Sequence, residues 1–300
     1  MLVLMPSRRR QRALTEVRVR SWDEFVAGVA DGPYADWAFR GQADASWSLE
    51  TSLGRYLRRF AVDRSAWRAQ EERSLRIFKR KAPNLLAAPP AREDHFQWLA
   101  LMEHHGAPTR LLDCTWSPFV AAFFALEQAT GDSAVWALDP RRLNQRACVV
   151  CRQPPARLDP RVPGNLMRRF YDARHSFVWI GEPDLMNRRL VAQSGTFLVP
   201  SAVDRTIDEI LLDDRATRGA IARIVLPAAV RDRAMRQLYS MNITLATLFP
   251  DLDGLARSLA FELEFHWGFD PRHPRRRAMR AAHDGSDAAA GDGRDARLKG

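Results

Sequence analysis

The chain has 300 residues, 46% of them hydrophobic and 27% charged, which is typical of a globular protein with a sizeable core and excludes a mainly disordered chain. Its longest strongly apolar run, residues 119–126, is far shorter than the ~20 residues that a membrane-spanning helix needs, so no such helix is predicted. Residues 1–14 place their apolar stretch before the arginines, which is the reverse of a secretory signal, and we therefore expect a cytoplasmic protein.

The net charge of +10 is concentrated at the two ends of the chain. Residues 1–20 contain six arginines and one acidic residue, and residues 271–300 contain eight basic and four acidic residues. The body between them is nearly neutral, so contact with nucleic acid is expected through the termini, and a local patch on the body stays open. Arginine richness is also what a GC-rich genome produces, and that second explanation stays open as well.

Cysteine usage indicates a reducing compartment, because the chain has three cysteines and an odd number does not make a disulfide framework. Cys148 and Cys151 form a lone C-x-x-C pair. A structural zinc ion needs four ligands, and no second pair of suitable spacing follows. No metal site is therefore predicted.

The first elements expected in the body are a strand over residues 37–40 and two amphipathic helices. Residues 67–81 repeat apolar side chains at helical spacing with charged residues between them, which predicts a helix. Residues 93–104 follow the same pattern and predict a second one. The apolar stripe of this second helix consists of Phe96, Leu99 and Ala100.

Ser117 and Pro118 predict the start of a third helix. A serine hydroxyl can bond the free N–H groups of a first turn, and proline fits there because its nitrogen carries no hydrogen. The helix is expected to continue through residues 119–129 and to be mostly buried, since most of its side chains are apolar. A strand is expected next, over residues 134–138.

The last expected elements are strands over residues 196–199 and 221–226 and a helix that Pro227 opens and that runs through Met241, with Asn242 as its C-terminal cap. Strands and helices are interspersed without a regular βαβ rhythm, which predicts an α+β fold, a single mixed α/β domain. No glycine-rich dinucleotide or P-loop pattern follows any strand, which disfavours both kinds of nucleotide site.

Domain boundaries are expected near the two ends of the chain. Residues 269–300 have too few large apolar side chains to offset the entropy of ordering, so they are predicted to be disordered, as is the basic arm of residues 1–20. No repeat or long linker interrupts residues 21–268, which predicts one globular domain there. Two halves packed together are the alternative.

Four separated blocks of sequence resemble one family. Residues 37–42 read WAFRGQ, and residues 104–118 read HHGAPTRLLDCTWSP and lead into the apolar helix. Residues 188–197 read RRLVAQSGTF, and residues 243–255 end in LFPDLDGL. Together, over residues 21–259, they resemble the FRG domain, which is named for its Phe-Arg-Gly and has its signature core at about residues 30–140 here.

The order of these blocks is also similar to that of the ADP-ribosyltransferase fold. In that fold an arginine on the first strand holds NAD, a strand bearing Ser or Thr leads into a helix, and a late acidic residue directs catalysis. The resemblance implies that Arg40 takes the first role, Thr115 and Ser117 the second, and Asp251 or Asp253 the third. It further implies a bacterial-type effector, used as a toxin or in phage defence, that consumes NAD.

The chemistry of NAD cleavage suits these residue types. The bond to nicotinamide breaks through an oxocarbenium-like transition state, which a carboxylate such as Asp251 or Asp253 would stabilise. Arg40 would pair with phosphate or ribose, and Gly41 would let main chain approach the ligand. His105 and Arg110 are second candidates for binding the cofactor.

Each of these residues also has a structural interpretation. Ser117 suits a helix cap, Asp251 suits the cap of a helix that follows it, and Arg110 and Asp113 suit a buried ion pair. The alternative function is a non-catalytic module in which Arg40 recognises a nucleotide or another anionic ligand and the basic termini contact RNA or DNA. The sequence does not separate this alternative from an NAD-dependent enzyme.

Overall fold

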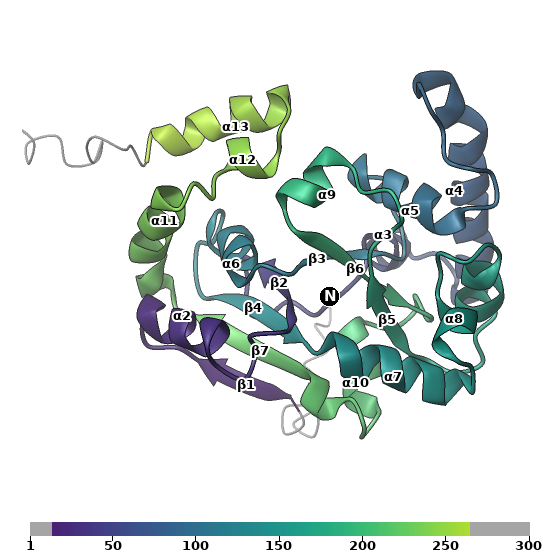
Figure 1. Ribbon diagram of the computed structural model, residues 1–300, viewed down its shortest axis with the longest axis horizontal. Helices are drawn as coiled ribbons and strands as arrows, with labels where there is room; N and C mark the ends of the chain where they lie inside the picture. Colours follow the sequence, from purple (N-terminus) through teal and green to yellow (C-terminus); the bar gives the residue numbers. More distant parts are fainter. Residues whose placement is uncertain (1–13, 265–300) are drawn as a thin grey trace, which may run out of the picture. The chain divides into compact units, whose positions relative to one another are not determined.

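The computed structural model describes residues 14–264 of the chain, which divides into two units, residues 1–238 and residues 239–300. The strands all belong to the first unit (Figure 1). They are β1 (Thr15–Arg18), β2 (Ala38–Gln42), β3 (Leu112–Thr115), β4 (Ser133–Leu138), β5 (Val178–Gly181), β6 (Gly195–Pro200) and β7 (Ile221–Leu226).

These strands form one open mixed sheet in the order β1-β7-β4-β2-β3-β6-β5. The β1–β7 pair is parallel, and the other pairings are antiparallel. The expected α+β class is confirmed by this arrangement of one mixed sheet with helices packed on it.

The helices vary in length from single turns to the four turns of α4. Those of the first unit are α2 (Trp22–Ala30), α3 (Ser52–Arg59), η1 (Arg64–Ala66), α4 (Trp67–Lys81), η2 (Ala82–Leu85), α5 (His95–His104), α6 (Pro118–Leu126), α7 (Pro140–Cys151), α8 (Pro155–Leu158), η3 (Leu166–Tyr171), α9 (Arg188–Ala192), α10 (Ile207–Asp213), η4 (Arg218–Ala220), η5 (Ala228–Val230) and most of α11 (Arg231–Ser240). The second unit contains α12 (Leu245–Leu248) and α13 (Leu252–Glu262).

Side chains alternate between the two faces of the sheet and meet different helices on each face. Leu112 of β3 and Leu198 of β6 belong to a core cluster that contains side chains of α7 and α10. Phe197, next to Leu198 in the same strand, belongs to another cluster with Phe96 and Leu99 of α5 and side chains of η3. The sheet is thus covered on both faces by helices of the first unit.

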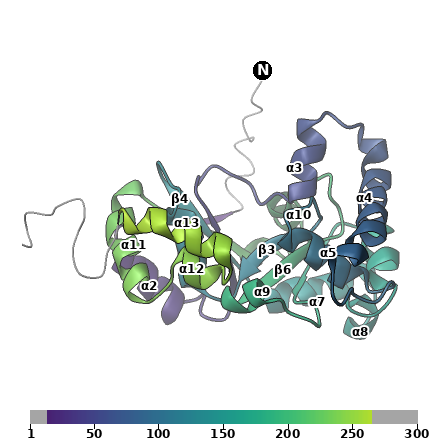
Figure 2. The ribbon, with the colours of Figure 1, turned by 90° about the horizontal axis from the view of Figure 1, so that it is seen from above.

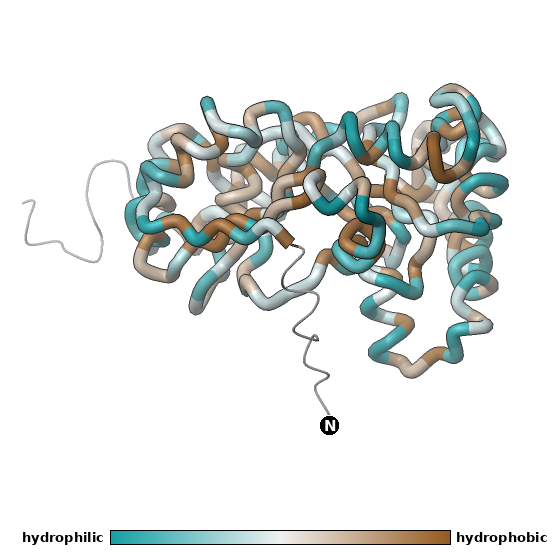
Figure 3. Tube along the Cα trace, turned by 90° about the horizontal axis from the view of Figure 1, so that it is seen from below, coloured by the Kyte–Doolittle hydropathy of each residue, from teal (hydrophilic) through white to brown (hydrophobic). Residues whose placement is uncertain are grey.

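Helices α3 and α4 form a pair that Figure 2 shows joined by a connecting loop. The pair is held by a small apolar cluster of Leu53, Leu57 and Trp67. The rest of both helices is mostly hydrophilic (Figure 3). Among residues 14–264, no helix combines the length and the apolar character that crossing a bilayer requires.

Several sequence predictions agree closely with the structure. The helix over residues 67–81 and the strand over residues 221–226 are confirmed to the residue. Residues 227–241 differ in part, because Pro227 is extended and leads into the short turn η5 before α11 begins at Arg231. The first turn of the expected helix is therefore a 3-10 turn, and the α-helix begins after it.

The prediction that residues 1–20 are disordered is wrong for Thr15–Arg18, which form strand β1. The backbone of this strand pairs with residues 222–225 of β7, and its arginine Arg18 forms an ion pair with Asp132 at 2.7 Å. Residues 1–13 lie outside the described residues, as does the predicted tail over residues 269–300. The basic composition of the segment concealed a strand because its partner lies about 200 residues away in sequence.

Candidate functional site

The two central strands of the sheet, β2 and β3, are paired at one position only, Phe39 opposite Thr115. Beyond it, β2 continues its pairing with β4 and β3 continues with β6, so the two strands part. The side chain of Arg40 crosses the gap, and its Nη1 donates a hydrogen bond to the carbonyl oxygen of Asp113 at 2.5 Å. A guanidinium group therefore takes the place of a strand-to-strand hydrogen bond.

A cavity of about 260 Å³, which we call the inner hollow, lies at this gap. A second cavity of about 770 Å³, the outer hollow, shares Arg40, Gly41 and Phe124 with it. The inner hollow alone is smaller than most ligand sites, whereas the outer one falls within their usual range of roughly 300–1,000 Å³. The inner hollow is lined by Phe39, Arg40, Gly41, Asp113, Cys114, Thr115, Ala121, Phe124, Arg189 and Gln193.

Two guanidinium groups face the outer hollow, those of Arg40 and Arg55. Burial lowers the pKa of Arg55, and the positive charge of Arg40 lowers it further. Like charges held close together are costly, and an anion between them would relieve the repulsion. The Nε of Arg40 is also buried and has no hydrogen-bond partner in the described part of the chain.

A carboxylate that the sequence did not single out, Glu103 at the end of α5, lies near these charges. Burial and the negative charge of Asp113 raise the pKa of Glu103 to about 7, against the lowering effects of Thr109 and Arg40. Its Oε2 accepts a hydrogen bond from the hydroxyl of Thr109 at 2.5 Å and a longer one from Ser52 at 3.4 Å. The pKa of Glu103 is therefore raised to about 7 although the positive charge of Arg40 lies nearby.

Replacing Glu103 by glutamine should remove a pH dependence of stability. Because the pKa of Glu103 is raised in the folded state, its stabilising protonation is fully present below about pH 4.5 and is lost as the pH rises to about 7. The variant Glu103→Gln should therefore match the parent near pH 4.5 and be more stable at pH 8, by on the order of 2–3 kcal/mol. Urea unfolding at the two pH values measures the difference.

The matched control is Glu93→Gln, which changes an exposed carboxylate just before the same helix. This variant should follow the pH dependence of the parent. A Glu103→Gln variant that loses stability with rising pH as steeply as the parent would show that the pKa of Glu103 is not raised in the folded protein.

The hydroxyl groups of Thr115 and Ser117 are already engaged. Thr115 lines the inner hollow, but its Oγ1 donates to the carbonyl oxygen of Gln193 at 2.6 Å and accepts from the backbone N–H of Ser117 at 3.0 Å. The Oγ of Ser117 accepts from the N–H of Val120 at 3.3 Å, which confirms the interpretation of Ser117 as a helix cap. Their contact with a cofactor stays a prediction.

Gly41 has a packing role that the sequence interpretation did not foresee. A Cβ atom at this position would lie 1.9 Å from the carbonyl oxygen of Ala121 and 2.6 Å from the backbone nitrogen of Ala125. Both atoms belong to the backbone of α6, so the glycine is needed for the close approach of this helix to β2. The close approach expected of a ligand is made here by the protein itself, although Gly41 also lines both hollows.

Arg110 lies in the interior and lines neither hollow. Its Nε and Nη2 donate to the two carboxylate oxygens of Glu71, each at 2.6 Å. The interpretation that Arg110 pairs with Asp113 is therefore wrong, since its partner is on α4. His105 is exposed at the end of α5 and lines neither hollow.

Asp251 and Asp253, the acids for which the sequence predicted a catalytic role, lie in the second unit. The carboxylate of Asp251 accepts a hydrogen bond from the N–H of Gly254 at 2.7 Å, which confirms the alternative that it caps a helix, here α13. Asp253 is exposed in the first turn of that helix, where a negative charge is favourable. Their catalytic role stays a prediction.

The structure thus brings Arg40, Gly41 and Thr115 together and adds Arg55 and Asp113 to the same two hollows. Over residues 14–264, no group of three His, Cys, Asp or Glu side chains is arranged to hold a metal ion. The arrangement offers guanidinium donors, a carboxylate and an apolar wall, which suits an anionic ligand that carries a ring.

Residues 35–134 match the family model of the FRG domain. The chain contains an FRG domain. The match covers about a third of the chain and includes Arg40, Arg55, Glu103 and Asp113, so the two parted strands and most of the surrounding charges belong to the FRG domain. No curated protein and no solved structure matches the chain.

Proposed function

We propose that the FRG domain binds NAD at Arg40 and that the protein uses this cofactor for ADP-ribosyl transfer or hydrolyses it. The observation that supports this most is the parting of β2 and β3, which leaves the side chain of Arg40 in the gap with an unbonded N–H. A buried donor without a partner costs about 1–3 kcal/mol, and a phosphate or ribose oxygen would satisfy it.

The charges of the outer hollow suit the pyrophosphate of NAD. Arg40 and Arg55 both line it, and hydrogen bonds from guanidinium to phosphate are among the strongest in proteins. The inner hollow is narrower and has Phe39, Ala121 and Phe124 in its wall, which suits the nicotinamide ring. The cofactor would therefore lie with its phosphates outside and its reactive end inside.

The reaction breaks the bond between the ribose C1′ and the nicotinamide nitrogen. The electron pair leaves with nicotinamide, and water or a nucleophile of a target attacks C1′ and loses its proton. A carboxylate near C1′ would stabilise the positive charge that develops on the ribose. In the first unit Asp113 lines the inner hollow, whereas Asp251 and Asp253 are the acids that the ADP-ribosyltransferase resemblance implies.

Arg40→Ala should weaken NAD binding by about 10- to 100-fold, since a hydrogen bond to a charged group contributes roughly 1.5–3 kcal/mol. At 100 times its dissociation constant for the parent, NAD should stabilise the parent by about 2.7 kcal/mol, and the variant, at the same NAD concentration, by only about 0.4–1.4 kcal/mol. Thermal unfolding with and without NAD measures the difference. Arg59→Ala is the control, because Arg59 is exposed on α3 and lines neither hollow.

Undiminished protection of Arg40→Ala by NAD would contradict the proposed site. Release of nicotinamide from labelled NAD, and transfer of label to protein or nucleic acid, test the reaction itself. Three single variants then identify the catalytic acid: Asp113→Asn, Asp251→Asn and Asp253→Asn. The variant that lacks the acid that stabilises the transition state should lose turnover and still bind NAD.

The second candidate is a non-catalytic module that binds a nucleotide or a phosphorylated ligand at Arg40. The hydrogen bonds of Thr115 and Ser117 favour this module. Both hydroxyl groups are hydrogen-bonded to backbone atoms and have little remaining capacity to bond the hydroxyl groups of a ribose. NAD binding without any release of nicotinamide would support this module over the enzyme.

A further inference from the structure

Two basic hollows lie beside one another on the first unit, and they share no lining residue with the inner and outer hollows at Arg40. The first, the α4 hollow, has a volume of about 680 Å³ and is lined by side chains of α4, η2, the segment between η2 and α5, α5 itself and Met167 of η3. The second, the η3 hollow, has a volume of about 1220 Å³ and is lined by side chains of α7, η3, the loop after η3, and α10 with its flanking residues. The two therefore form a surface separate from the site at Arg40.

The α4 hollow has an excess of positive charge. Arg76, Arg80 and Arg92 line it, and none of them forms an ion pair with a carboxylate of the described residues. Burial lowers the pKa of Lys79, another lining residue, and the charge of Arg92 lowers it further. The only carboxylate in the lining, that of Glu72, is bonded to Arg68 at 2.9 Å.

The η3 hollow is lined by three carboxylates, and each of them has an arginine partner. Asp172 is bonded to Arg68, Asp213 to Arg205 and Asp214 to Arg146. The remaining arginines of the lining have no carboxylate partner within residues 14–264, and the Nε of one of them, Arg169, is buried without a hydrogen bond. These arginines are Arg152, Arg168, Arg169 and Arg174.

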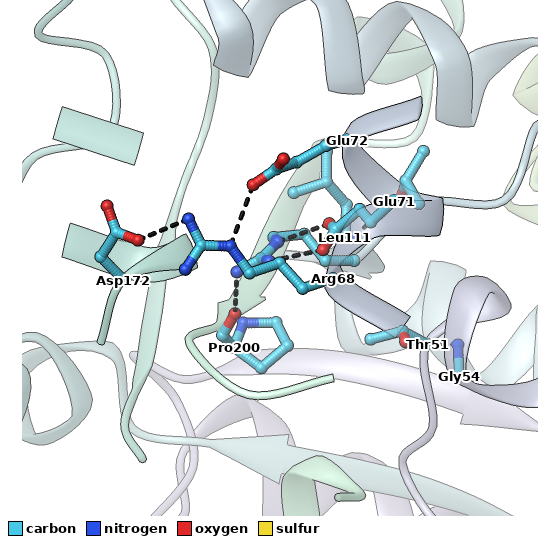
Figure 4. A network of polar contacts seen from close by, with 10 residues as sticks. Thr51, Gly54, Arg68, Glu71, Glu72, Leu111, Asp172 and Pro200 are labelled. Carbon is cyan, nitrogen blue, oxygen red and sulfur yellow. Dashed lines mark hydrogen bonds and ion pairs between the residues drawn. The ribbon is translucent and has the colours of Figure 1, made fainter. Parts of the chain in front are cut away.

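A single side chain connects the two hollows. The guanidinium of Arg68 lies between Glu72 in the wall of the α4 hollow and Asp172 in the wall of the η3 hollow, at 2.9 and 2.5 Å (Figure 4). The walls of the hollows are therefore only the width of one guanidinium apart. Met167 and Arg168, neighbours in η3, line one hollow each.

The size of this joint surface decides the class of ligand. Arg68 and Arg80 are twelve residues apart on α4, which corresponds to about 18 Å along a helix, and the η3 hollow extends the surface further. A single phosphate group or a mononucleotide would leave most of these arginines without an anion. A flat membrane would not enter two concave hollows, whereas a strand with regularly spaced phosphates would.

We propose that the α4 and η3 hollows together bind the phosphodiester backbone of a nucleic acid. The arginines would bind phosphate groups, which carry affinity and little sequence preference. This site lies on the body of the protein, apart from the basic termini, and it does not depend on the reaction proposed for Arg40.

Two triple variants of the full chain test the proposal, one for each hollow: Arg76→Gln, Arg80→Gln and Arg92→Gln, and Arg152→Gln, Arg168→Gln and Arg174→Gln. All six side chains are exposed, so the fold should be kept, and thermal unfolding verifies this. The control triple removes the same charge from exposed arginines that line none of these four hollows: Arg20→Gln, Arg59→Gln and Arg141→Gln.

Fluorescence anisotropy with labelled single-stranded RNA and DNA, at several salt concentrations, gives the affinities. Each hollow triple should bind about tenfold more weakly or worse than the parent. The slope of log K against log salt should also become shallower by about 2, at roughly 0.7 for each phosphate that is no longer neutralised. The control should keep the slope of the parent, and the two probes show which nucleic acid is preferred.

Three results would overturn the proposal. Equal weakening in the control and the hollow triples would assign the binding to overall charge and the termini. Weakening in only one hollow triple would indicate a compact phosphate site in place of a strand. Binding of vesicles rich in anionic lipid, with no binding of RNA or DNA, would indicate a membrane surface.

Discussion

Replacing Glu71 by alanine should destabilise the first unit by about 3–5 kcal/mol, which for a unit of this size lowers Tm by roughly 6–20 °C. The carboxylate of Glu71 accepts two hydrogen bonds from Arg110, and both side chains are almost fully buried. Burial lowers the pKa of Arg110, but the charge and hydrogen bonds of Glu71 outweigh it and raise the pKa overall. Without Glu71 a charged group would stay buried without a counter-ion.

The pair also fixes the start of a strand that lines the site. Arg110 immediately precedes Leu111 and β3, its Nη1 donates to the carbonyl oxygen of Pro200 at the end of β6, and its guanidinium lies 3.8 Å from the ring centre of Tyr171. Removal of Glu71 should therefore loosen the strand that carries Asp113. Urea unfolding gives the free energy, and far-UV circular dichroism verifies that a folded state is reached.

Glu72→Ala is the matched control, one residue further along α4. Glu72 is partly exposed and forms a surface ion pair with Arg68, so its removal should cost less than about 1 kcal/mol. A double variant, Glu71→Leu with Arg110→Met, removes both charges and should recover much of the stability. If Glu71→Ala is as stable as Glu72→Ala, water solvates Arg110 or another carboxylate pairs with it, and the Glu71–Arg110 pair is not needed for stability.

Gly41→Ala should have the second large effect, a destabilisation of about 3 kcal/mol or more. The added methyl group would clash with backbone atoms of α6 at distances down to 1.9 Å. A flexible side chain could change rotamer to relieve such a clash, but a helix backbone cannot. The helix would have to move away from β2 and so widen the inner hollow. Thermal unfolding measures the change in stability, and NAD protection measures the change at the site.

Gly28→Ala serves as the control, because this substitution should raise the stability of the protein instead of lowering it. Gly28 lies within α2, and a Cβ atom there meets nothing within 4 Å. Alanine in the interior of a helix is favoured over glycine by about 0.5–1 kcal/mol, so this variant should be slightly more stable than the parent. Similar destabilisation in both variants would contradict the packing role of Gly41.

The sequence predicted the elements whose signals are local. Ser117 and Pro118 carry their own capping chemistry, and α6 begins where they indicate. The residue pattern did not indicate strand β3, which only the ADP-ribosyltransferase resemblance implied, because its four residues include a charged Asp113 and do not alternate, and its position depends on pairing with β6. Short strands of this kind are defined by their neighbours in space, which a single sequence does not reveal.

In the candidate site, too, residues with a local sequence signal were predicted and residues brought together only by the fold were not. Arg40 was identified because it lies in the Phe-Arg-Gly segment, and the structure places it in the gap between two strands. Glu103 was missed, although it continues the apolar stripe of Phe96, Leu99 and Ala100 at helical spacing and a carboxylate on such a stripe must be buried or bonded. The two basic hollows had no signal of their own, because their arginines come from separate segments of a nearly neutral body.

The parallel pairing of β1 with β7 has a consequence for synthesis on the ribosome. Val17 pairs with Ile224, so the earliest strand waits for about 200 further residues before its partner has been made. At 5–20 residues per second this delay lasts on the order of 10–40 s. Throughout that time the backbone of Thr15–Arg18 has no strand to pair with. The charged side chains of Glu16 and Arg18 keep the nascent segment hydrated until β7 has been synthesised.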